Sequence, residues 1–390
     1  MSRDRQDRLP IAALLALATA AFITILTEAL PAGLLPQMAQ GLAVSQAWVG
    51  QTVTAYALGS LLAAMPLTAA TQGLRRRPLL LAALAGFVIA NTVTALSGSF
   101  ALTMVARFLA GMAAGLLWAL LAAYAARLVP EHRKGRAIAI AMVGTPVALS
   151  LGVPAGTFLG QWLGWRICFV GMSGLALLLM LWVRVQVPDL AGQAAGRRPS
   201  LGQVFQVAGV RPVLFVVLAF VLAHNILYTY IAPVLAALGM AGRIDRVLLV
   251  FGLASLPGIW LVGLLVDRHL RALTLASTIL FGLSALALGL AGHEPALVYG
   301  AIAAWGLAFG GAATLFQTAI AKTAGDAADL AQSMLVTAWN LAIAGGGIAG
   351  GLLLERLGTA MFSPVLLLLL LSTLPVVWAA RRHGFPAARA

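Results

Sequence analysis

Long runs of apolar residues, separated by short polar segments, extend along nearly the whole chain. A helix needs about 20 apolar residues to cross the hydrocarbon core of a bilayer, and these runs reach that length. The strands of a membrane barrel are about 10 residues long and alternate in polarity, which these runs do not. The pattern predicts an all-α integral membrane protein with twelve transmembrane helices, at 10–33, 47–70, 78–97, 100–128, 137–161, 165–185, 211–237, 247–266, 272–291, 295–319, 331–354 and 360–380.

The longest polar connection lies at the middle of the chain and contains Pro188, Gly192 and Pro199. Clusters of proline, glycine and polar residues between apolar segments are typical of a linker. The other connections are mostly very short, so successive helices are expected to be antiparallel neighbours. We therefore predict an N-terminal six-helix bundle at 1–185, a cytoplasmic linker at 186–210 and a C-terminal six-helix bundle at 211–390.

Two features recur in both halves with one shared offset. The polar segment that begins at Thr68, after the second span, corresponds to the segment that begins at Gly263, after the eighth span, 195 positions later. The same offset relates Gly152 in the fifth span to Gly347 in the eleventh. A shared offset indicates an internal repeat, so the two bundles are expected to be pseudo-symmetric. Parallel six-helix repeats are typical of transporters that bind substrate near the bilayer midplane between the repeats.

Composition agrees with a membrane protein and restricts its partners. The 390 residues are 62% hydrophobic and 9% charged, with a mean hydropathy of +0.99. The formal net charge of +14 is spread over short loops and does not gather in a tail, which argues against a nucleic-acid partner. The single cysteine, Cys168, excludes an intrachain disulfide and a cysteine-based metal site. The first apolar run exceeds the 7–15 residues of a signal-peptide core, so we interpret it as a span.

The distribution of lysine and arginine predicts the orientation in the membrane. Cytoplasmic loops carry an excess of these residues. If the N-terminus is cytoplasmic, the outer loops hold only Arg166, Arg243, Arg246 and Arg356. The cytoplasmic side then holds most of the other basic residues, among them Arg75, Arg76, Arg77, Arg133, Lys134, Arg136, Arg197, Arg198, Arg268, Arg271, Lys322, Arg381 and Arg382. We expect both termini to be cytoplasmic, in the inner membrane of a bacterial cell.

Glu28 is the only acidic residue well inside a predicted span. A charged carboxylate there costs roughly 2.5–3.5 kcal/mol on insertion scales, so intramembrane acids are functional candidates. Thr24 and Pro31 share its helix face at spacings of four and three residues. This face is expected to point into the bundle, with Glu28 carrying a proton and contacting substrate and Thr24 contributing to substrate binding. The alternative is a buried glutamate that stays neutral or pairs with an arginine for structure only.

Arg107 is the only lysine or arginine deep in a span. We expect it to tune the proton site by its charge. The alternative is an arginine that ties helices together by bonding backbone carbonyls. Gly111 and Gly115 follow at four-residue spacing, which is typical of close helix packing.

The seventh span supplies a second set of candidates, His224, Asn225 and Tyr228. His224 lies one position from the repeat equivalent of Glu28. Histidine titrates near neutral pH and hydrogen-bonds polar ligands, so a substrate or proton role competes evenly with a histidine that only joins helices. Asn340 in the eleventh span and Gln317 in the tenth are weaker substrate-binding candidates. Tyr56 and Trp260 are expected to be packing residues.

Several motifs resemble the major facilitator superfamily, and within it the twelve-helix drug/proton antiporters. Gly263-x-x-x-Asp267-Arg268-x-x-Arg271 is similar to the superfamily's signature loop, here in its second-half copy. The first-half copy has Gln72 where the signature has Asp. Arg107-Phe-Leu-Ala-Gly111 resembles the basic motif of helix four, and Gly152-Val-Pro154-Ala-Gly156 the antiporter motif of helix five. The run from Thr27 to Pro36 is similar to the branch of sugar (arabinose), purine-nucleoside and chloramphenicol efflux permeases.

The resemblance implies how two groups of residues act. Gly152, Pro154 and Gly156 permit a helix bend, which would bias the side on which a central cavity opens. Gly263, Asp267, Arg268 and Arg271 would form an intracellular latch; the alternative is a polar turn that obeys the positive-inside rule. In such antiporters, proton and substrate couple through a carboxylate like Glu28.

We therefore predict a proton-coupled antiporter that exports a small organic solute by alternating access. The sequence contains no Gly-x-x-x-x-Gly-Lys-Ser/Thr phosphate loop and no metal-ligand spacing, so neither ATP-driven pumping nor a cofactor or metal is expected, and no enzymatic activity. The expected partners are the solute, protons and the lipid bilayer, and the expected state is a monomer. The alternatives are an uptake symporter, a passive facilitator or a membrane protein without transport.

Overall fold

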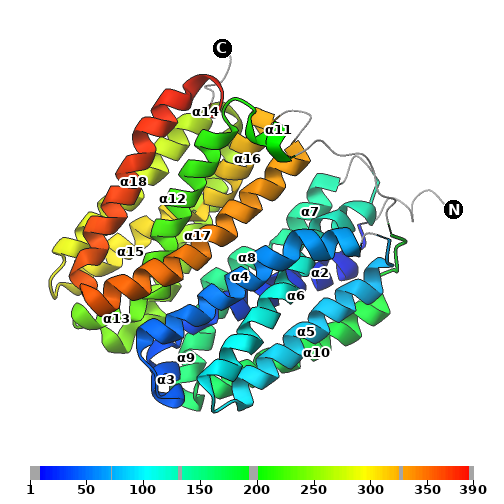
Figure 1. Cartoon of the computed structure of the whole chain (residues 1–390), viewed down its shortest axis with the longest axis horizontal. Coiled ribbons are helices and arrows are strands. Elements are labelled where there is room, and N and C mark those ends of the chain that lie inside the picture. The colour runs from blue at the N-terminus through cyan, green and yellow to red at the C-terminus, as the bar shows by residue number, and fades with distance from the viewer. Residues whose placement is uncertain (1–8, 72, 131–133, 193–200, 325–327, 386–390) are drawn as a thin grey trace. The chain divides into compact units, whose positions relative to one another are not determined.

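The computed structural model describes residues 9–71, 73–130, 134–192, 201–324 and 328–385 (Figure 1). Within these ranges the ordered elements are helices and no strand occurs, so the all-α prediction is confirmed. The chain forms two compact units: unit 1 comprises Met1–Val44 with Ala55–Gly196, and unit 2 comprises Ser45–Thr54 with Arg197–Ala390. Gln72 and the basic residues Arg133, Arg197 and Arg198 lie outside the described ranges.

Unit 1 contains the first six predicted spans, except for the start of the second, which belongs to unit 2. Gly164, with a positive φ of 86°, separates the fifth span from the sixth at a backbone conformation that glycine adopts readily. The helices are α2 Ile11–Gly33, α3 Leu35–Leu42, most of α4 Gln46–Ala70, α5 Arg76–Leu96, α6 Phe100–Arg127, α7 Lys134–Met142, α8 Gly144–Val147, the π-helix η2 Ala148–Gly152, α9 Val153–Leu163 and α10 Trp165–Gln186.

Unit 2 contains the start of α4 and the last six predicted spans. Its elements are α11 Leu201–Phe205, α12 Val210–Thr229, α13 Ile231–Ala237, η3 Ala241–Arg243, α14 Ile244–Leu290, α15 Pro295–Gly310, α16 Ala312–Ala324, α17 Ala328–Arg356, η5 Thr359–Met361, α18 Phe362–Ala379 and η6 Ala380–Arg382. The seventh span breaks at Tyr230, and the tenth breaks at Gly311.

The predicted spans correspond one by one to these helices. Ten stretches of the described residues are long and apolar enough to cross a membrane. One of them, Ala241–Leu290, holds both the eighth and the ninth predicted span, which meet at the non-helical backbone of His269 (φ −126°, ψ 28°). The 25-residue helix α4 supplies the second span. The twelve-helix prediction is confirmed.

Glycines bring the helices of unit 1 close together. A Cβ at Gly111 of α6 would overlap the carbonyl oxygen of Tyr56 in α4, and a Cβ at Gly115 would press against the carbonyl of Ser60. The packing role predicted for Gly111 and Gly115 is confirmed. Close approach of α4 and α6 is what places Tyr56 next to the buried side chain of Arg107.

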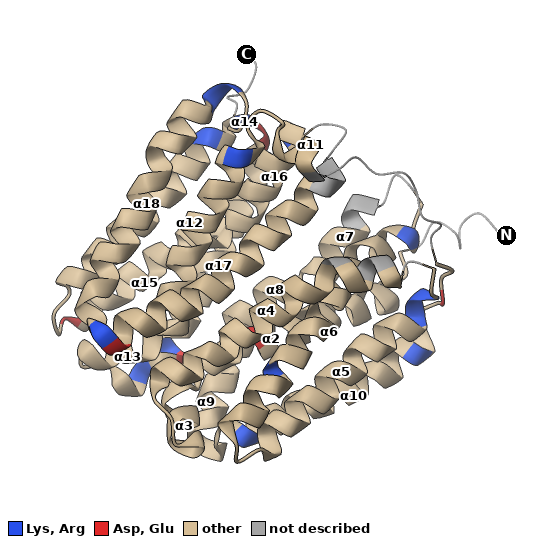
Figure 2. Cartoon of the chain, in the orientation of Figure 1, with Lys and Arg blue, Asp and Glu red and all other residues tan. Residues whose placement is uncertain are grey.

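Figure 2 shows the charged residues mostly near the ends of helices, with long uncharged stretches between them. This distribution is expected when the middle of each helix crosses hydrocarbon, because charged side chains are costly there. Large apolar side chains such as Leu178, Leu181 and Leu368 remain exposed on the outside of the helices. Such side chains suit a lipid-facing surface.

Candidate functional site

Pro31 interrupts the backbone hydrogen bonding of α2 next to Glu28. In an α-helix each N–H donates to the carbonyl four residues earlier, and proline has no N–H, so position 31 offers nothing to the carbonyl of Thr27. Arg107 of α6 fills this role. Its Nη1 donates to Thr27 O at 2.6 Å and its Nη2 donates to Glu28 O at 3.3 Å. The guanidinium therefore bonds α2 at its proline and lies beside Glu28.

Arg107 is fully buried and is held from its other side by α4. Its Cζ lies 4.9 Å from the centroid of the Tyr56 ring, a cation–π contact. The Tyr56 hydroxyl in turn donates to Thr24 O at 3.0 Å. Tyr56 was expected only to pack, and the structure adds these polar contacts.

The two interpretations of Arg107 are compatible in this geometry. Its bonds to backbone carbonyls are those expected of an arginine that joins helices. Its charge also interacts with the half-buried carboxyl of Glu28. A change of charge on Glu28 therefore acts on the same guanidinium that bonds the backbone of α2 next to Pro31.

Asn91 of α5 belongs to the same buried group, although its sequence position did not single it out. Its Nδ2 donates to Thr27 Oγ1 at 3.2 Å, and Met172 Sδ of α10 lies 3.8 Å from the same hydroxyl. Asn91 Oδ1 has no hydrogen-bond partner in the described part of the chain. Asn91 is a fully buried amide in the middle of an apolar span, and that was the available signal.

Thr24 is fully buried on α2, and its hydroxyl donates to Ala20 O at 2.8 Å. Both polar groups of Thr24 are thus used inside the protein, the hydroxyl by its own helix and the carbonyl by Tyr56. Its contribution to substrate binding stays a prediction.

The fifth span packs its glycines against α2. A Cβ at Gly144 would overlap the Ala18 carbonyl, and one at Gly152 would press on the Phe22 ring. Gly156 faces Leu30 in the same way. The π-helix Ala148–Gly152 directly precedes Pro154, so the wide turn coincides with the predicted bend. The π-helix thus lies in the span that packs along α2, the helix of Glu28, and a bend at this place stays a prediction.

His224 lies in an aromatic cluster of unit 2, which we define as His224, Tyr228, Phe251, Trp305 and Phe309. The imidazole stacks on Phe309, with ring centroids 3.4 Å apart and planes 7° from parallel. Tyr228 and Trp305 follow with centroids at 5.3 Å, and Phe251 at 5.8 Å. The structure thus brings His224 and Tyr228 together.

The predicted amide side chains of unit 2 bond to their own helices or lie at the surface. Asn225 Nδ2 donates to Val221 O at 2.8 Å, and Asn340 Nδ2 donates to Val336 O at 3.0 Å. Gln317 is exposed. None of these contacts tests a substrate role, which stays a prediction for all three.

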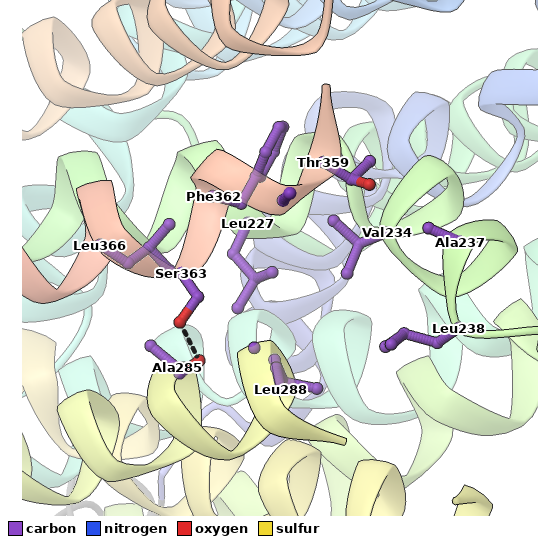
Figure 3. A pocket seen from close by; sticks show the side chains of 12 residues that line it. Leu227, Val234, Ala237, Leu238, Ala285, Leu288, Thr359, Phe362, Ser363 and Leu366 are labelled. Atoms are coloured by element: carbon purple, nitrogen blue, oxygen red, sulfur yellow. Dashed lines mark hydrogen bonds between the residues drawn. The ribbon is translucent and has the colours of Figure 1, made fainter. Parts of the chain in front are cut away.

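A cavity of about 250 Å³ lies in unit 2 among α12, α13, α14, η5 and α18 (Figure 3). Its lining is mostly leucine, valine and alanine, and the hydroxyl of Ser363 is used by a hydrogen bond to Ala285 O at 2.6 Å. Neither the predicted substrate-binding residues nor any titratable side chain lines it. Besides Ser363, the only polar side chain of its lining is that of Thr359, so the cavity offers few groups that would fix a polar solute.

The second-half signature loop contacts a neighbouring helix end. Lys322 Nζ lies 3.7 Å from Asp267 Oδ1 and donates to Asp267 O at 2.9 Å. Arg271 lies with its Cζ 5.8 Å from the centroid of the Trp378 ring in α18. Gly263 and Arg268 are exposed. The loop is thus tied to α16 and α18, and its action as a latch stays a prediction.

In the first half, an acid from another segment bonds the basic loop. Asp189, which follows α10, pairs with Arg75 at 2.5 Å and accepts from the Arg77 N–H at 3.2 Å. Burial alone would raise the pKa of the Asp189 carboxyl, but the hydrogen bonds from Arg75 and Arg77 together with their charges outweigh it and hold the pKa below its usual range. Tyr124 adds a bond to Pro188 O at 2.6 Å.

Comparison with known proteins settles the family. The sequence profile of the Major Facilitator Superfamily matches residues 17–347. The chain belongs to this superfamily. It is 30% identical over 358 residues to the "Purine ribonucleoside efflux pump NepI" of Escherichia coli O1:K1 / APEC, with 90% of each chain covered. The protein of the same description in Escherichia coli strain K12 is 29% identical over the same length.

A solved structure agrees in fold. The partially occluded inward-open xylose transporter XylE from E. coli superposes with a TM-score of 0.76 over 95% of this chain and 99% of its own, at 14% identity. The resemblance to the major facilitator superfamily, and with it the expectation of a multi-pass membrane transporter, is confirmed. Members of this superfamily are transporters rather than enzymes.

Proposed function

We propose that this major facilitator superfamily transporter exports a small organic solute in exchange for protons, with Glu28 as the group that carries the proton. The observation that carries the proposal is the contact of Arg107 with the backbone of α2 at Glu28 and at the neighbouring Thr27. A half-buried carboxyl beside a buried cation can exist in either charge state, because the cation favours the charged form and burial favours the neutral form.

Protonation of Glu28 would act on the conformation through Arg107. When Glu28 is charged, it attracts the guanidinium, which at the same time bonds the carbonyl that Pro31 leaves unpaired. When Glu28 is neutral, that attraction is lost and only the carbonyl bonds remain. The part of α2 around Pro31, and the fifth span that packs on α2 at Gly144 and Gly152, thus respond to the proton.

The solute class rests on the relatives. The proteins of about 30% identity are described as purine ribonucleoside efflux pumps, which makes a nucleoside the first solute to test. His224, Asn225 and Tyr228 of α12, with Gln317 and Asn340, remain the candidates for binding it. We further propose that the protein works as a monomer in a bacterial inner membrane with both termini cytoplasmic, and that Gly263, Asp267, Arg268 and Arg271 act as an intracellular latch.

Flux into sealed liposomes tests the proposal. Purified protein is reconstituted, and pH-gradient-driven flux is measured for a pentose, a purine nucleoside and a chloramphenicol-like drug. We expect flux of one compound in the wild type, loss of that flux in Glu28→Gln, and normal flux in the matched control Glu294→Gln, which changes an exposed glutamate outside the spans.

The alternatives give different results in the same assay. Flux that ignores the pH gradient and survives Glu28→Gln would indicate a passive facilitator and a structural Glu28. Accumulation on the alkaline side, where the solute moves with protons, would indicate uptake by symport.

A further inference from the structure

The aromatic cluster of unit 2 contains two buried polar atoms that the protein leaves unpaired. His224 Nδ1 and Trp305 Nε1 have no hydrogen-bond partner among the described residues. His224 is 6% exposed and Trp305 is 0% exposed, so bulk water does not satisfy these atoms. Buried polar atoms are nearly always hydrogen-bonded, and an exception in a protein interior points to a missing ligand or water.

The two unpaired atoms are chemically complementary to one kind of ligand edge. Trp305 Nε1–H can only donate, whereas His224 Nδ1 can accept or donate according to its tautomer. Their rings are 5.3 Å apart between centroids. A ligand that carries a hydrogen-bond acceptor next to a donor is therefore chemically matched to this pair of atoms.

The faces around these atoms favour a flat ring. Phe309 stacks on the imidazole of His224 at 3.4 Å, and Tyr228 and Phe251 close the cluster from other sides. Phe309 is less buried than its partners and lies beside Gly310 and Gly311, where α15 ends and α16 begins. The ring that lies nearest to His224 thus lies at a break in its helix.

We propose that the aromatic cluster recognises the base of the exported solute, a flat heteroaromatic ring with an adjacent donor and acceptor, which enters when the Phe309 ring moves off His224 and presents its edge to the two unpaired atoms. This inference rests on the proposed export function and names its solute class. A purine base fits: in a 6-oxopurine, the exocyclic carbonyl oxygen on C6 accepts from Trp305 Nε1–H while the neighbouring N1–H donates to His224 Nδ1. A sugar without a base offers no face to stack, so recognition lies in the base and not in the ribose.

Equilibrium binding to the purified full-length protein in detergent tests this inference with inosine, purine riboside and ribose. Purine riboside keeps the flat ring but lacks the oxygen and the N–H of the edge. We expect inosine to bind and ribose not to bind. Purine riboside should bind about five- to tenfold more weakly, because it loses the hydrogen bond to Trp305 while its N1 can accept from His224 Nδ1 in the other tautomer. This comparison uses the wild type and needs no variant to fold.

Single-residue variants test which side chains of the cluster contact the base. His224→Phe keeps an aromatic ring without its nitrogens and is expected to weaken inosine binding by a similar factor. Phe309→Ala removes the ring that competes with the base and is expected to raise the affinity for inosine. Phe316→Ala is the matched control, because Phe316 lies in the same span and packs on Phe220 and Trp339, outside the defined cluster.

Three results would overturn the inference: no binding of inosine, equal affinity for inosine and purine riboside, or unchanged affinity in a folded His224→Phe protein. The liposome assay separates this failure from failure of the export proposal. A pentose or drug driven by the pH gradient, with no inosine binding, would refute base recognition and leave proton-coupled export standing.

Discussion

The contact between Arg107 and the carbonyl that Pro31 leaves unpaired predicts a specific non-additivity. Arg107→Met removes the guanidinium and strands the buried carbonyl of Thr27. Pro31→Ala restores an N–H at position 31, which can pair with that carbonyl in the ordinary helical way. In the Pro31→Ala background, Arg107→Met should therefore be less costly than in the wild type.

The expected magnitude follows from the bond. A hydrogen bond to a charged group contributes about 1.5–3 kcal/mol, and a stranded buried carbonyl costs about 1–3 kcal/mol. Interhelical hydrogen bonds in membrane proteins average only about 0.6 kcal/mol, with a maximum near 1.7 kcal/mol. The Arg107 bond is short, at 2.6 Å, and its donor is charged, so the upper part of that range applies. We expect a coupling energy of about 1–2 kcal/mol between the two substitutions.

The assay is a double-mutant cycle on the free energy of unfolding, measured by denaturant titration in mixed micelles for the wild type, both single variants and the double variant. Additive effects, within about 0.3–0.5 kcal/mol, would refute the idea that Arg107 replaces the missing N–H of Pro31. Arg107→Lys serves as a control that keeps the charge but loses the planar pair of donors.

Two further predictions concern packing and the first-half loop. Gly111→Ala should lower the free energy of unfolding by about 1–3 kcal/mol, because the added Cβ meets the Tyr56 carbonyl. Gly171→Ala, which has open space around it, is the control and should leave the free energy of unfolding unchanged in the same denaturant titration. The lowered pKa of Asp189 means that its contact with Arg75 stabilises the protein above the usual pKa of aspartate, about 3.9, and that this contribution fades as the pH falls through the lowered value. The melting temperatures of wild type and Asp189→Asn should therefore differ at pH 7 and converge on acidification; a gap that does not change with pH would contradict this.

The spans and the central pair of charges were predictable because both are signals along the chain. A run of apolar residues determines a membrane helix locally, and a single charge such as Glu28 or Arg107 stands out within it. What the sequence did not show is that Arg107 bonds the carbonyl freed by Pro31. That contact joins α2 and α6, and its partner is a backbone atom, which has no signature in the sequence.

Other features could not be predicted from the sequence because they also arise from contacts between segments that are distant along the chain. Asn91 joins the group only because α5 packs beside Thr27. The first-half loop lacks the signature acid at Gln72, yet its Arg75 has an acidic partner, Asp189, from a segment 114 residues away. The break at His269, where the eighth and ninth spans meet within α14, likewise follows from backbone geometry rather than from composition.

The most direct test of the central claim is proton release on substrate binding. The compound identified by the flux panel is added to purified protein in weakly buffered detergent solution, and the pH change is followed with an indicator dye for the wild type, Glu28→Gln and Glu294→Gln. The account predicts proton release by the wild type and by Glu294→Gln, and none by Glu28→Gln, while binding itself is measured in parallel. Release of equal size from a Glu28→Gln protein that still binds the compound would show that another group carries the proton.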